Sequence, residues 1–190
     1  MQVLPLLRVQ ARANRLANRR LHAAVAALPE AEFHAPRTGF FPSLAATLNH
    51  VLEVDGYYIG ALAGEQDLGT WWDRFVPAAT LAELAERQAA SDERLIALVD
   101  ALDEAGAEAV VAMPRRDHVQ RERAAFVLLH LTMHQTHHRG QAHAMLSGTA
   151  VAPPQLDEFL MPSEAPLRRA DMAALGWDEA AVYGRPPSGP

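Results

Sequence analysis

Residues Leu129–Gln141 read LHLTMHQTHHRGQ and lie within a long run of residues that favour an α-helix. On that helix His134 and His138 are four positions apart, so their side chains share one face, with Cβ atoms roughly 5–6 Å apart. Two imidazoles placed in this way can bind one metal ion, at about 2.0–2.1 Å per Zn–N bond. Two protein ligands rarely suffice, and the best candidate for a third is His50, in a separate helix-favouring segment.

The same stretch offers more than one chelating pair. Five of the nine histidines fall between positions 130 and 143, and the pairs 130/134, 134/137 and 134/138 are each spaced to share an ion. The spacing alone does not choose among them. A lone histidine is more often packed or exposed than a ligand, and no ligand role is assigned to His22, His34, His118 and His143. A site of three imidazoles would leave a position for water or substrate, and nitrogen ligands suit zinc, nickel, copper or iron.

Helix signals dominate the rest of the chain. Ser43 is the expected N-cap of one helix, and Thr80 with Glu83 forms the capping-box pattern that opens another. The apolar spacing and the Pro and Gly breaks predict four long helices, at about 6–28, 43–63, 80–102 and 121–146. These patterns predict an all-α fold, a four-helix bundle with long connections.

The predicted bundle occupies residues 1–165, and residues 166–190 form a C-terminal extension. The extension carries one short helix signal at 167–175, and we expect the chain end from Gly184 to be disordered. Within the bundle, residues 109–113 favour a short extended piece.

Composition excludes several classes of protein. Cysteine is absent, so disulfides, a thiolate nucleophile and a cysteine-based zinc site are impossible. The 17 basic residues, all arginine, and 23 acidic residues give a net charge of −6, which argues against nucleic acid as a partner. No apolar run approaches the roughly 20 residues that span a bilayer, and residues 1–7 are too short for a signal-peptide core. We therefore expect no membrane association and a cytoplasmic location.

One basic stripe departs from the acidic average. Arg8, Arg12, Arg15 and Arg19 follow one face of the first predicted helix. A solvated outer face is the favoured interpretation, and a site for a polyanion or an acidic partner is the alternative.

Other catalytic motifs are missing. The sequence has no H-E-x-x-H and no Glu-x-x-His pair, which excludes a zincin and a ferritin-like di-iron centre. It also has no G-x-S-x-G, no P-loop and no G-x-G-x-x-G.

Three segments together resemble the DinB-like superfamily (DinB/YfiT-like) of metalloenzymes. They are residues 14–21 (NRLANRRL), like the family's N-x-x-x-N-x-x-L; residues 47–55 (TLNHVLEVD), like its LNHL-x-x-x-D; and residues 134–141 (HQTHHRGQ), like its H-x-x-H-H-R-G-Q. Their order and spacing agree over about residues 5–160, and the third motif is the most specific.

The resemblance implies an up-down-down-up bundle, commonly a homodimer. It implies that His50, His134 and His138 bind a divalent metal ion, with zinc or nickel the first candidates, and that His130 and His137 lie outside this triad. By spacing, Glu53 and Gln141 are in reach of the imidazoles, whereas Asp55 points away from His50. A purpose for Gly140 would be close helix approach near the site; a tolerated glycine near a helix end is the alternative.

The leading functional hypothesis is a metal-dependent enzyme, a transferase or hydrolase type. Some relatives in the superfamily are thiol-dependent transferases or isomerases that use bacillithiol, mycothiol or glutathione. By analogy, the metal would activate a low-molecular-weight thiol or water. The aromatic residues Trp71, Trp72 and Phe75 would wall the pocket or, as the favoured interpretation, pack in the core. The alternatives are a non-catalytic, stress-related metal or small-ligand binding protein and a metal-free interaction module that uses the arginine stripe.

Overall fold

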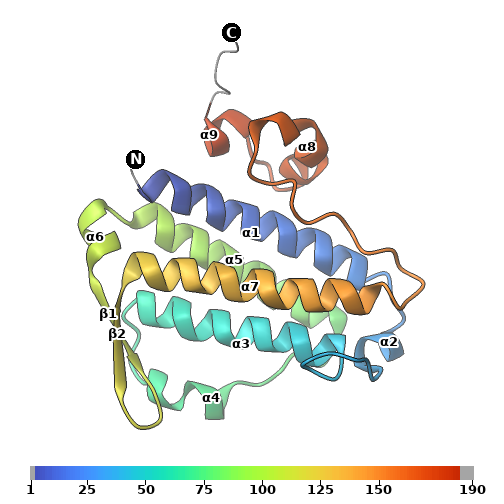
Figure 1. Cartoon of the computed structure of the whole chain (residues 1–190), viewed down its shortest axis with the longest axis horizontal. Helices are drawn as coiled ribbons and strands as arrows, with labels where there is room; N and C mark the ends of the chain where they lie inside the picture. Colours follow the sequence, from blue (N-terminus) through green and yellow to red (C-terminus); the bar gives the residue numbers. More distant parts are fainter. Residues whose placement is uncertain (1–2, 185–190) are drawn as a thin grey trace.

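A computed structural model describes residues 3–184 of the chain. Four long helices form its body: α1 (Val3–Val25), α3 (Leu44–Leu62), α5 (Leu81–Ala101) and α7 (Ala124–Leu146). They lie side by side as a bundle (Figure 1), in which α1 and α3 each pack against both α5 and α7. The all-α four-helix bundle expected from the sequence is confirmed.

The direction of the helices follows from which ends meet. Arg8 near the start of α1 donates hydrogen bonds to the carbonyls of Asp100 and Leu102 at the end of α5, so these two helices are antiparallel. The carbonyl of Ala78, just before α5, accepts a hydrogen bond from Asn49 near the start of α3, so α3 and α5 run parallel. Tyr58 late in α3 contacts His130 early in α7, so that pair is antiparallel. The topology is therefore up-down-down-up (Figure 1).

Local sequence signals set two of the helix starts. Ser43 has extended backbone, and its side chain accepts a hydrogen bond from the Ala46 amide; Thr80 does the same for the Glu83 amide. The first helix was predicted at 6–28 but ends at Val25, and the short helix α2 (Glu30–His34) follows. α2 is too short to carry a hydrophobic period, so the sequence did not reveal it.

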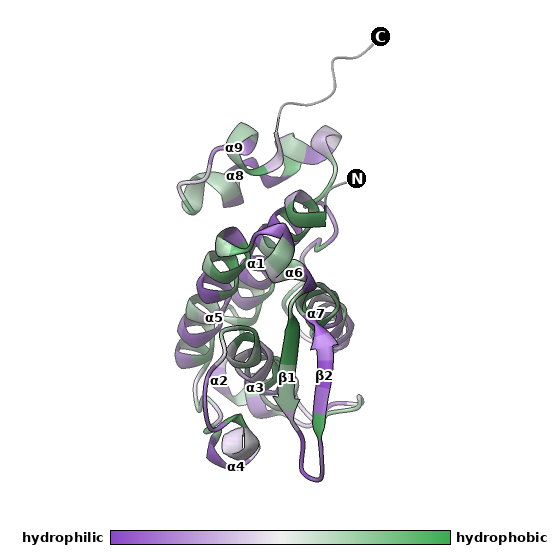
Figure 2. Ribbon diagram, turned by 90° about the vertical axis from the view of Figure 1, so that its left-hand side faces the viewer, coloured by the Kyte–Doolittle hydropathy of each residue, from purple (hydrophilic) through white to green (hydrophobic). Residues whose placement is uncertain are grey.

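A β-hairpin closes one end of the bundle. β1 (Val110–Pro114) confirms the expected extended piece, and the short helix α6 (Glu104–Glu108) precedes it. Its partner β2 (Val119–Arg123) was not predicted, and the expected helix start near 121 was wrong because residues 121–123 belong to this strand. Figure 2 shows β1 as hydrophobic and β2 as hydrophilic. Because β2 has no buried residue, it lacks the alternation that marks a half-buried strand.

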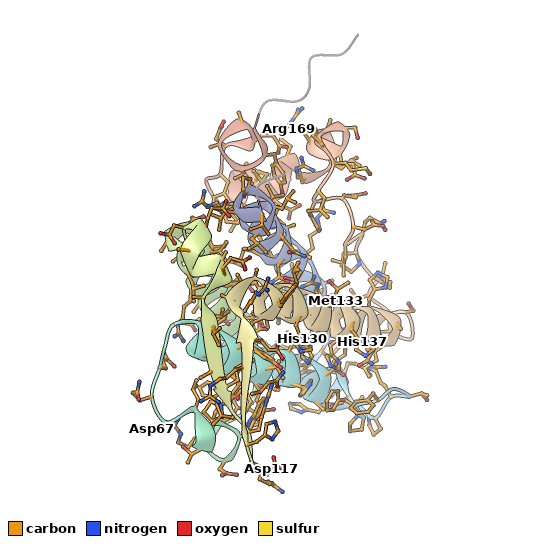
Figure 3. All side chains as sticks on the ribbon, turned by 60° about the vertical axis from the view of Figure 1, so that its left-hand side comes forward. Asp67, Asp117, His130, Met133, His137 and Arg169 are labelled. Atoms are coloured by element: carbon orange, nitrogen blue, oxygen red, sulfur yellow. The ribbon has the colours of Figure 1, made fainter. Side chains whose placement is uncertain are left out.

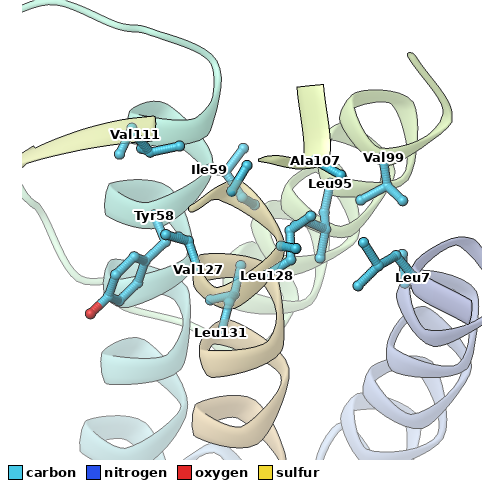
Figure 4. Close-up of a cluster of buried hydrophobic side chains, with 14 of the residues drawn as sticks. Leu7, Tyr58, Ile59, Leu95, Val99, Ala107, Val111, Val127, Leu128 and Leu131 are labelled. Carbon is cyan, nitrogen blue, oxygen red and sulfur yellow. The ribbon is translucent and has the colours of Figure 1, made fainter. Parts of the chain in front are cut away.

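The main hydrophobic core lies at the hairpin end of the bundle. In Figure 4, Tyr58, Val127 and Leu131 meet between α3 and α7, while Leu7 and Leu95 approach from α1 and α5. A second cluster fills the opposite end of the bundle. Burial on this scale, at roughly 25 cal/mol per Å² of apolar surface, stabilises the bundle and fixes the helices that carry the histidines.

In the aromatic segment between α3 and α5, Trp71 and Phe75 pack against the core, whereas Trp72 is 40% exposed. The segment contains the short 3₁₀ helix η1 (Leu68–Thr70) and α4 (Trp71–Arg74) rather than plain loop. The Trp71 ring lies against Gly56 of α3, and its Nε1 donates to the Glu53 carbonyl at 2.9 Å. This arrangement supports core packing over the pocket-wall hypothesis for Trp71.

The arginine stripe does not form a free surface. Arg12 makes two hydrogen bonds to Asp100, at 2.9 and 2.6 Å, and Arg15 pairs with Glu93 at 3.0 Å. Arg19 pairs with Asp171, in the C-terminal extension, at 2.7 Å. Arg8 donates to two carbonyls at the end of α5. The favoured interpretation of a solvated face was wrong, because the stripe joins α1 to α5 and to the C-terminal extension.

The C-terminal extension packs on α1 (Figure 1). The 3₁₀ helix η2 (Pro162–Glu164) leads into it. The extension itself holds α8 (Ala165–Ala174), which begins one residue before residue 166 and lies close to the helix expected at 167–175, and the unpredicted α9 (Glu179–Tyr183). The expectation of a disordered end concerns residues 185–190, which lie outside the described part of the chain. Among residues 3–184, no helix has both the length and the apolar character needed to cross a bilayer.

Candidate metal centre

Two antiparallel helices bring three histidines together. His50 comes from the second turn of α3, and His134 and His138 come from successive turns of α7. One nitrogen from each of the three imidazoles lies within 4.8 Å of the other two. Of the chelating pairs that spacing left open, the structure joins 134/138 to His50.

The distances within this group suit one shared ion. His50 Nε2 and His134 Nε2 lie 3.1 Å apart, and the ring centroids of His134 and His138 lie 4.4 Å apart. Two nitrogens that each bind a common ion at about 2.0–2.1 Å stand roughly 3 Å from each other. The spacing of the two Nε2 atoms therefore matches that of two ligands of one metal.

The protonation state of the triad also suits a metal. Burial lowers the pKa of His50, His134 and His138, because it disfavours the charged imidazolium. The effect is largest for His134, whose pKa falls to about 3. Burial is the main cause, and repulsion from the neighbouring histidines lowers this pKa further. All three rings are therefore neutral at pH 7, which is the form that binds a metal.

Of the three imidazole rings, only that of His138 has its Nδ1 held by a hydrogen bond to a neighbouring side chain among the described residues. His138 Nδ1 lies 2.9 Å from Gln141 Oε1, so this ring presents Nε2 to the site. Glu53 Oε2 is 3.8 Å from His50 Nδ1, beyond hydrogen-bond distance. His134 Nδ1 is buried without a hydrogen-bond partner among the described residues. Of the two supporting residues expected from spacing, Gln141 contacts a ring and Glu53 does not.

Two further histidines border the site without joining it. His137 Nε2 lies 3.0 Å from Gln141 Nε2, and the His130 ring packs edge-on against Tyr58 at 5.2 Å. Figure 3 shows His130 and His137 along α7 together with Met133. The implied exclusion of His130 and His137 from the triad agrees with this placement.

An aromatic side chain covers one flank of the triad. The Phe41 ring, in the connection before α3, lies 4.6 Å from the His50 ring and 5.6 Å from the His138 ring. Its neighbour Phe40 is 79% exposed. Phe41 thus keeps part of the site dry, while half-buried His50 leaves part of it open to solvent.

The remaining residues of the motifs form a buried polar network beside the triad. Its seven members come from all four long helices and are nearly inaccessible to solvent: Asn14, Asn18, Asp55, Gln88, Asp92, Gln135 and Arg139. This network explains Asp55, which the helix geometry directed away from His50. Five members belong to the three motifs, so those motifs specify this network as well as the histidines.

Amide groups link the two carboxyls of the network. Gln135 Nε2 and Gln88 Nε2 donate to Asp55 at 2.6 and 2.7 Å. Gln88 Nε2 also donates to Asp92 at 3.1 Å, and Asn18 Nδ2 donates to Asp92 at 2.8 Å. Burial raises the pKa of Asp55 to about 8, with repulsion from Asp92 adding to it, and burial raises the pKa of Asp92 to about 7.

Sequence reasoning missed Gln88 and Asp92. The signal was present, because both lie on the α5 face whose other positions, Leu84, Leu95 and Val99, are buried in the core. Polar residues at core positions of an amphipathic helix indicate buried partners. The partners themselves become visible only when α1, α3 and α7 are placed around that face.

Asn49, next to His50, has a structural role. Its Oδ1 accepts a hydrogen bond from the Ala78 amide at 2.7 Å, and its Nδ2 donates to the Ala78 carbonyl at 3.0 Å. These bonds fix the segment before α5 to the turn of α3 that carries His50.

The fold and the three convergent imidazoles define a helical bundle with a candidate three-histidine metal centre. The comparison with protein families agrees with this class. The chain belongs to the DinB family, whose model matches residues 5–171. No curated protein matches the sequence.

The expected purpose of Gly140, close helix approach, was wrong, because a Cβ at this position would meet nothing within 4 Å.

Proposed function

We propose that the protein is a metal-dependent enzyme of the thiol-dependent S-transferase or hydrolase type, with His50, His134 and His138 as the ligands of one divalent ion. The observation that carries this proposal is the 3.1 Å separation of His50 Nε2 and His134 Nε2, reached across two helices. Neutral imidazoles suit zinc or nickel, which are the ions we propose first.

A divalent ion bound by three nitrogens would lower the pKa of a thiol or water in its open position and so supply a nucleophile at neutral pH. The chain contributes the rest of the site. Gln141 fixes the orientation of the His138 ring, and Phe41 excludes water from one flank. The open flank beside His50 is where a small electrophilic substrate would enter.

A low-molecular-weight thiol is the proposed co-substrate. This part of the proposal rests on the family and on the absence of cysteine, because a chain without a thiolate of its own must take the sulfur nucleophile from solution. A hydrolase would instead use water at the same position.

Activity of the metal-loaded protein tests the proposal. Purified protein would be loaded with Zn²⁺ or Ni²⁺ and assayed with glutathione, bacillithiol and mycothiol against a panel of alkyl halides, epoxides and esters. We expect turnover that is lost in His134→Ala and kept in His118→Ala, a histidine at the exposed tip of the hairpin. Turnover that survives in His134→Ala would contradict the assignment.

The second candidate is a non-catalytic, stress-related metal or small-ligand binding protein. Only part of the triad surface is open, and buried His138 limits access to the ion. This candidate predicts stoichiometric metal without turnover by any thiol or by water. The arginine stripe needed by a metal-free interaction module is already engaged in contacts within the chain.

We also propose a cytoplasmic homodimer. The outer face of α7 exposes large apolar side chains at helical spacing, namely Phe126 (56%), Leu129 (39%) and Met133 (73%). A two-fold contact through this face would cover them. Light scattering should give twice the chain mass for the wild type and the chain mass for Met133→Glu; a monomeric wild type would refute the dimer.

A further inference from the structure

A cavity of about 460 Å³ lies on the face of α7 opposite the histidine triad. Its walls are the α1 residues Ala13 and Ala17 and the α7 residues Thr136 and Gly140, and residues 155–160 of the C-terminal segment cover it. The volume falls within the range of about 300–1,000 Å³ typical of small-molecule sites. Since His138 and Gly140 differ by roughly 200° around the helix, the cavity is separate from the metal centre.

The interior combines apolar walls with one buried cation. Leu156, Phe159 and Leu160 line the cover, and Arg139 lines the floor. Arg139 is only 7% exposed. A buried guanidinium normally lies against a carboxylate, because isolation of its charge from water is unfavourable.

No carboxylate of the described residues lies directly against Arg139, and Asp55 and Asp92 of the buried network attract it only from beyond ion-pair distance. Its Nη1 donates to the amide oxygens of Asn14, Asn18 (3.0 Å) and Gln135 (3.1 Å), and its Nη2 donates to Thr136 Oγ1 at 3.3 Å. Every one of these acceptors is neutral. Among the described residues, no carboxylate lies within ion-pair distance of Arg139.

One acidic residue, Asp157, lies among the residues that line the cavity. Asp157 is exposed, and it already accepts a hydrogen bond from Gln155. The guanidinium on the floor therefore makes no direct contact with a carboxylate of residues 3–184, although it lies beside apolar walls.

We propose that this cavity binds a small amphipathic carboxylate, with its carboxylate at Arg139 and its hydrocarbon body between α1 and the cover of residues 155–160. The ligand would place a carboxylate in direct contact with Arg139 and would fill apolar space. Thr136 accepts from the guanidinium, so the Nη2 edge of Arg139 faces the cavity wall where the carboxylate sits.

Octanoate is the probe, and 1-octanol is the control of equal chain length without charge. We expect calorimetric titration of the full chain to show octanoate binding about tenfold or more tighter than 1-octanol, the effect of one charge-assisted hydrogen bond. Equal affinity for the two, or no octanoate binding at millimolar concentration, would overturn the proposal.

Two variants test the position without removing Arg139. Gly140→Leu fills the cavity, because nothing lies within 4 Å of a Cβ there, and Thr136→Asp places a carboxylate beside Arg139. Each should weaken octanoate binding about tenfold or more. Ala144→Leu and Ala144→Asp make the same changes at an exposed position of α7 outside the cavity and should bind like the wild type. Unchanged binding in Gly140→Leu would place the ligand elsewhere.

A carboxylate can also bind a metal ion, so the titration is repeated in His50→Ala. The proposal expects unchanged octanoate affinity in this variant, because the cavity lies on the other face of α7. Loss of binding in His50→Ala would assign octanoate to the metal centre and overturn the proposal.

Discussion

Gln135 Nε2 donates a hydrogen bond to Asp55 Oδ2 at 2.6 Å. Gln135 directly follows the proposed metal ligand His134 in the chain. His50 and Asp55 likewise share α3, five residues apart. The pair α3/α7 therefore makes two polar contacts close together, one between imidazoles and one between an amide and a carboxyl. The buried network fixes the relative position of the two helices on which the histidine triad depends.

The orienting bond to His138 should matter for metal affinity. Gln141→Ala removes the acceptor at His138 Nδ1 and leaves all three proposed ligands in place. We expect metal affinity, measured by competition with a chromophoric chelator, to fall about 10- to 100-fold. Glu53→Ala is the matched control, because Glu53 makes no hydrogen bond to His50, and it should bind metal nearly as the wild type does. Equal losses in both variants would contradict this role for Gln141.

Stability should fall as pH rises through the titration of the buried carboxyls. The pKa values of Asp55 and Asp92 are raised from 3.8 to about 8 and about 7, so between these limits the folded state binds more protons than the unfolded state. Their contribution is complete below pH 3.8 and is lost as the pH passes 7 and then 8. Each carboxyl that stays protonated only in the folded state contributes a slope of at most about 1.4 kcal/mol per pH unit.

Urea unfolding of chelator-treated protein between pH 6.5 and 8.5 measures this slope. The histidines, whose pKa values are lowered, act in the opposite direction only below their ordinary value of 6.5. Asp55→Asn should flatten the curve between pH 7 and 8. A wild-type curve that rises with pH over this window would show that the carboxyls are ionised in the folded state.

Arg139 should be essential for stability. Arg139→Met removes the donor to the amide oxygens of Asn14 and Asn18, which are buried and have no other donor among the described residues. Gln135 Oε1, in contrast, keeps its bond from Asn18. We expect the free energy of unfolding in urea to fall by about 3 kcal/mol or more, since a buried unsatisfied group is unfavourable by about 1–3 kcal/mol. Arg169→Met, at an exposed position of α8, is the control and should change stability by less than about 0.5 kcal/mol. A loss below 1 kcal/mol in Arg139→Met would refute the network's contribution.

Two helical glycines should respond oppositely to alanine. A Cβ at Gly56 would overlap the Trp71 ring, whereas one at Gly140 meets nothing within 4 Å. We expect Gly56→Ala to destabilise the protein by about 1–3 kcal/mol and to shift tryptophan fluorescence to the red. Gly140→Ala should stabilise it by up to about 1 kcal/mol, the difference in helix propensity. Thermal unfolding of both variants checks the pair, and the same sign for both would contradict the packing described.

The sequence predicted the long helices because caps and apolar periods are local signals. Ser43 and Thr80 marked their helices correctly. The hairpin strand β2 escaped prediction because VQRER has no buried face and continues directly into α7. The short helices α2 and α4 have too few residues to show a period.

The part of the candidate site that lies within one helix was also predictable from local sequence. The 134/138 spacing is a property of one helix, but the choice of His50 depended on family resemblance, since nothing local brings α3 against α7. The partners of Asp92 and Arg139 come from helices far apart in sequence, so the network required the assembled bundle.

Metal content of untagged protein purified without chelator tests the central claim most directly, measured by elemental analysis beside His50→Ala and the exposed control His118→Ala. We predict close to one zinc, nickel or other first-row metal ion per chain in the wild type and in His118→Ala, and loss of that ion in His50→Ala. A wild type without metal that also fails to bind added Zn²⁺ or Ni²⁺, or a His50→Ala variant with full metal content, would contradict the three-histidine site.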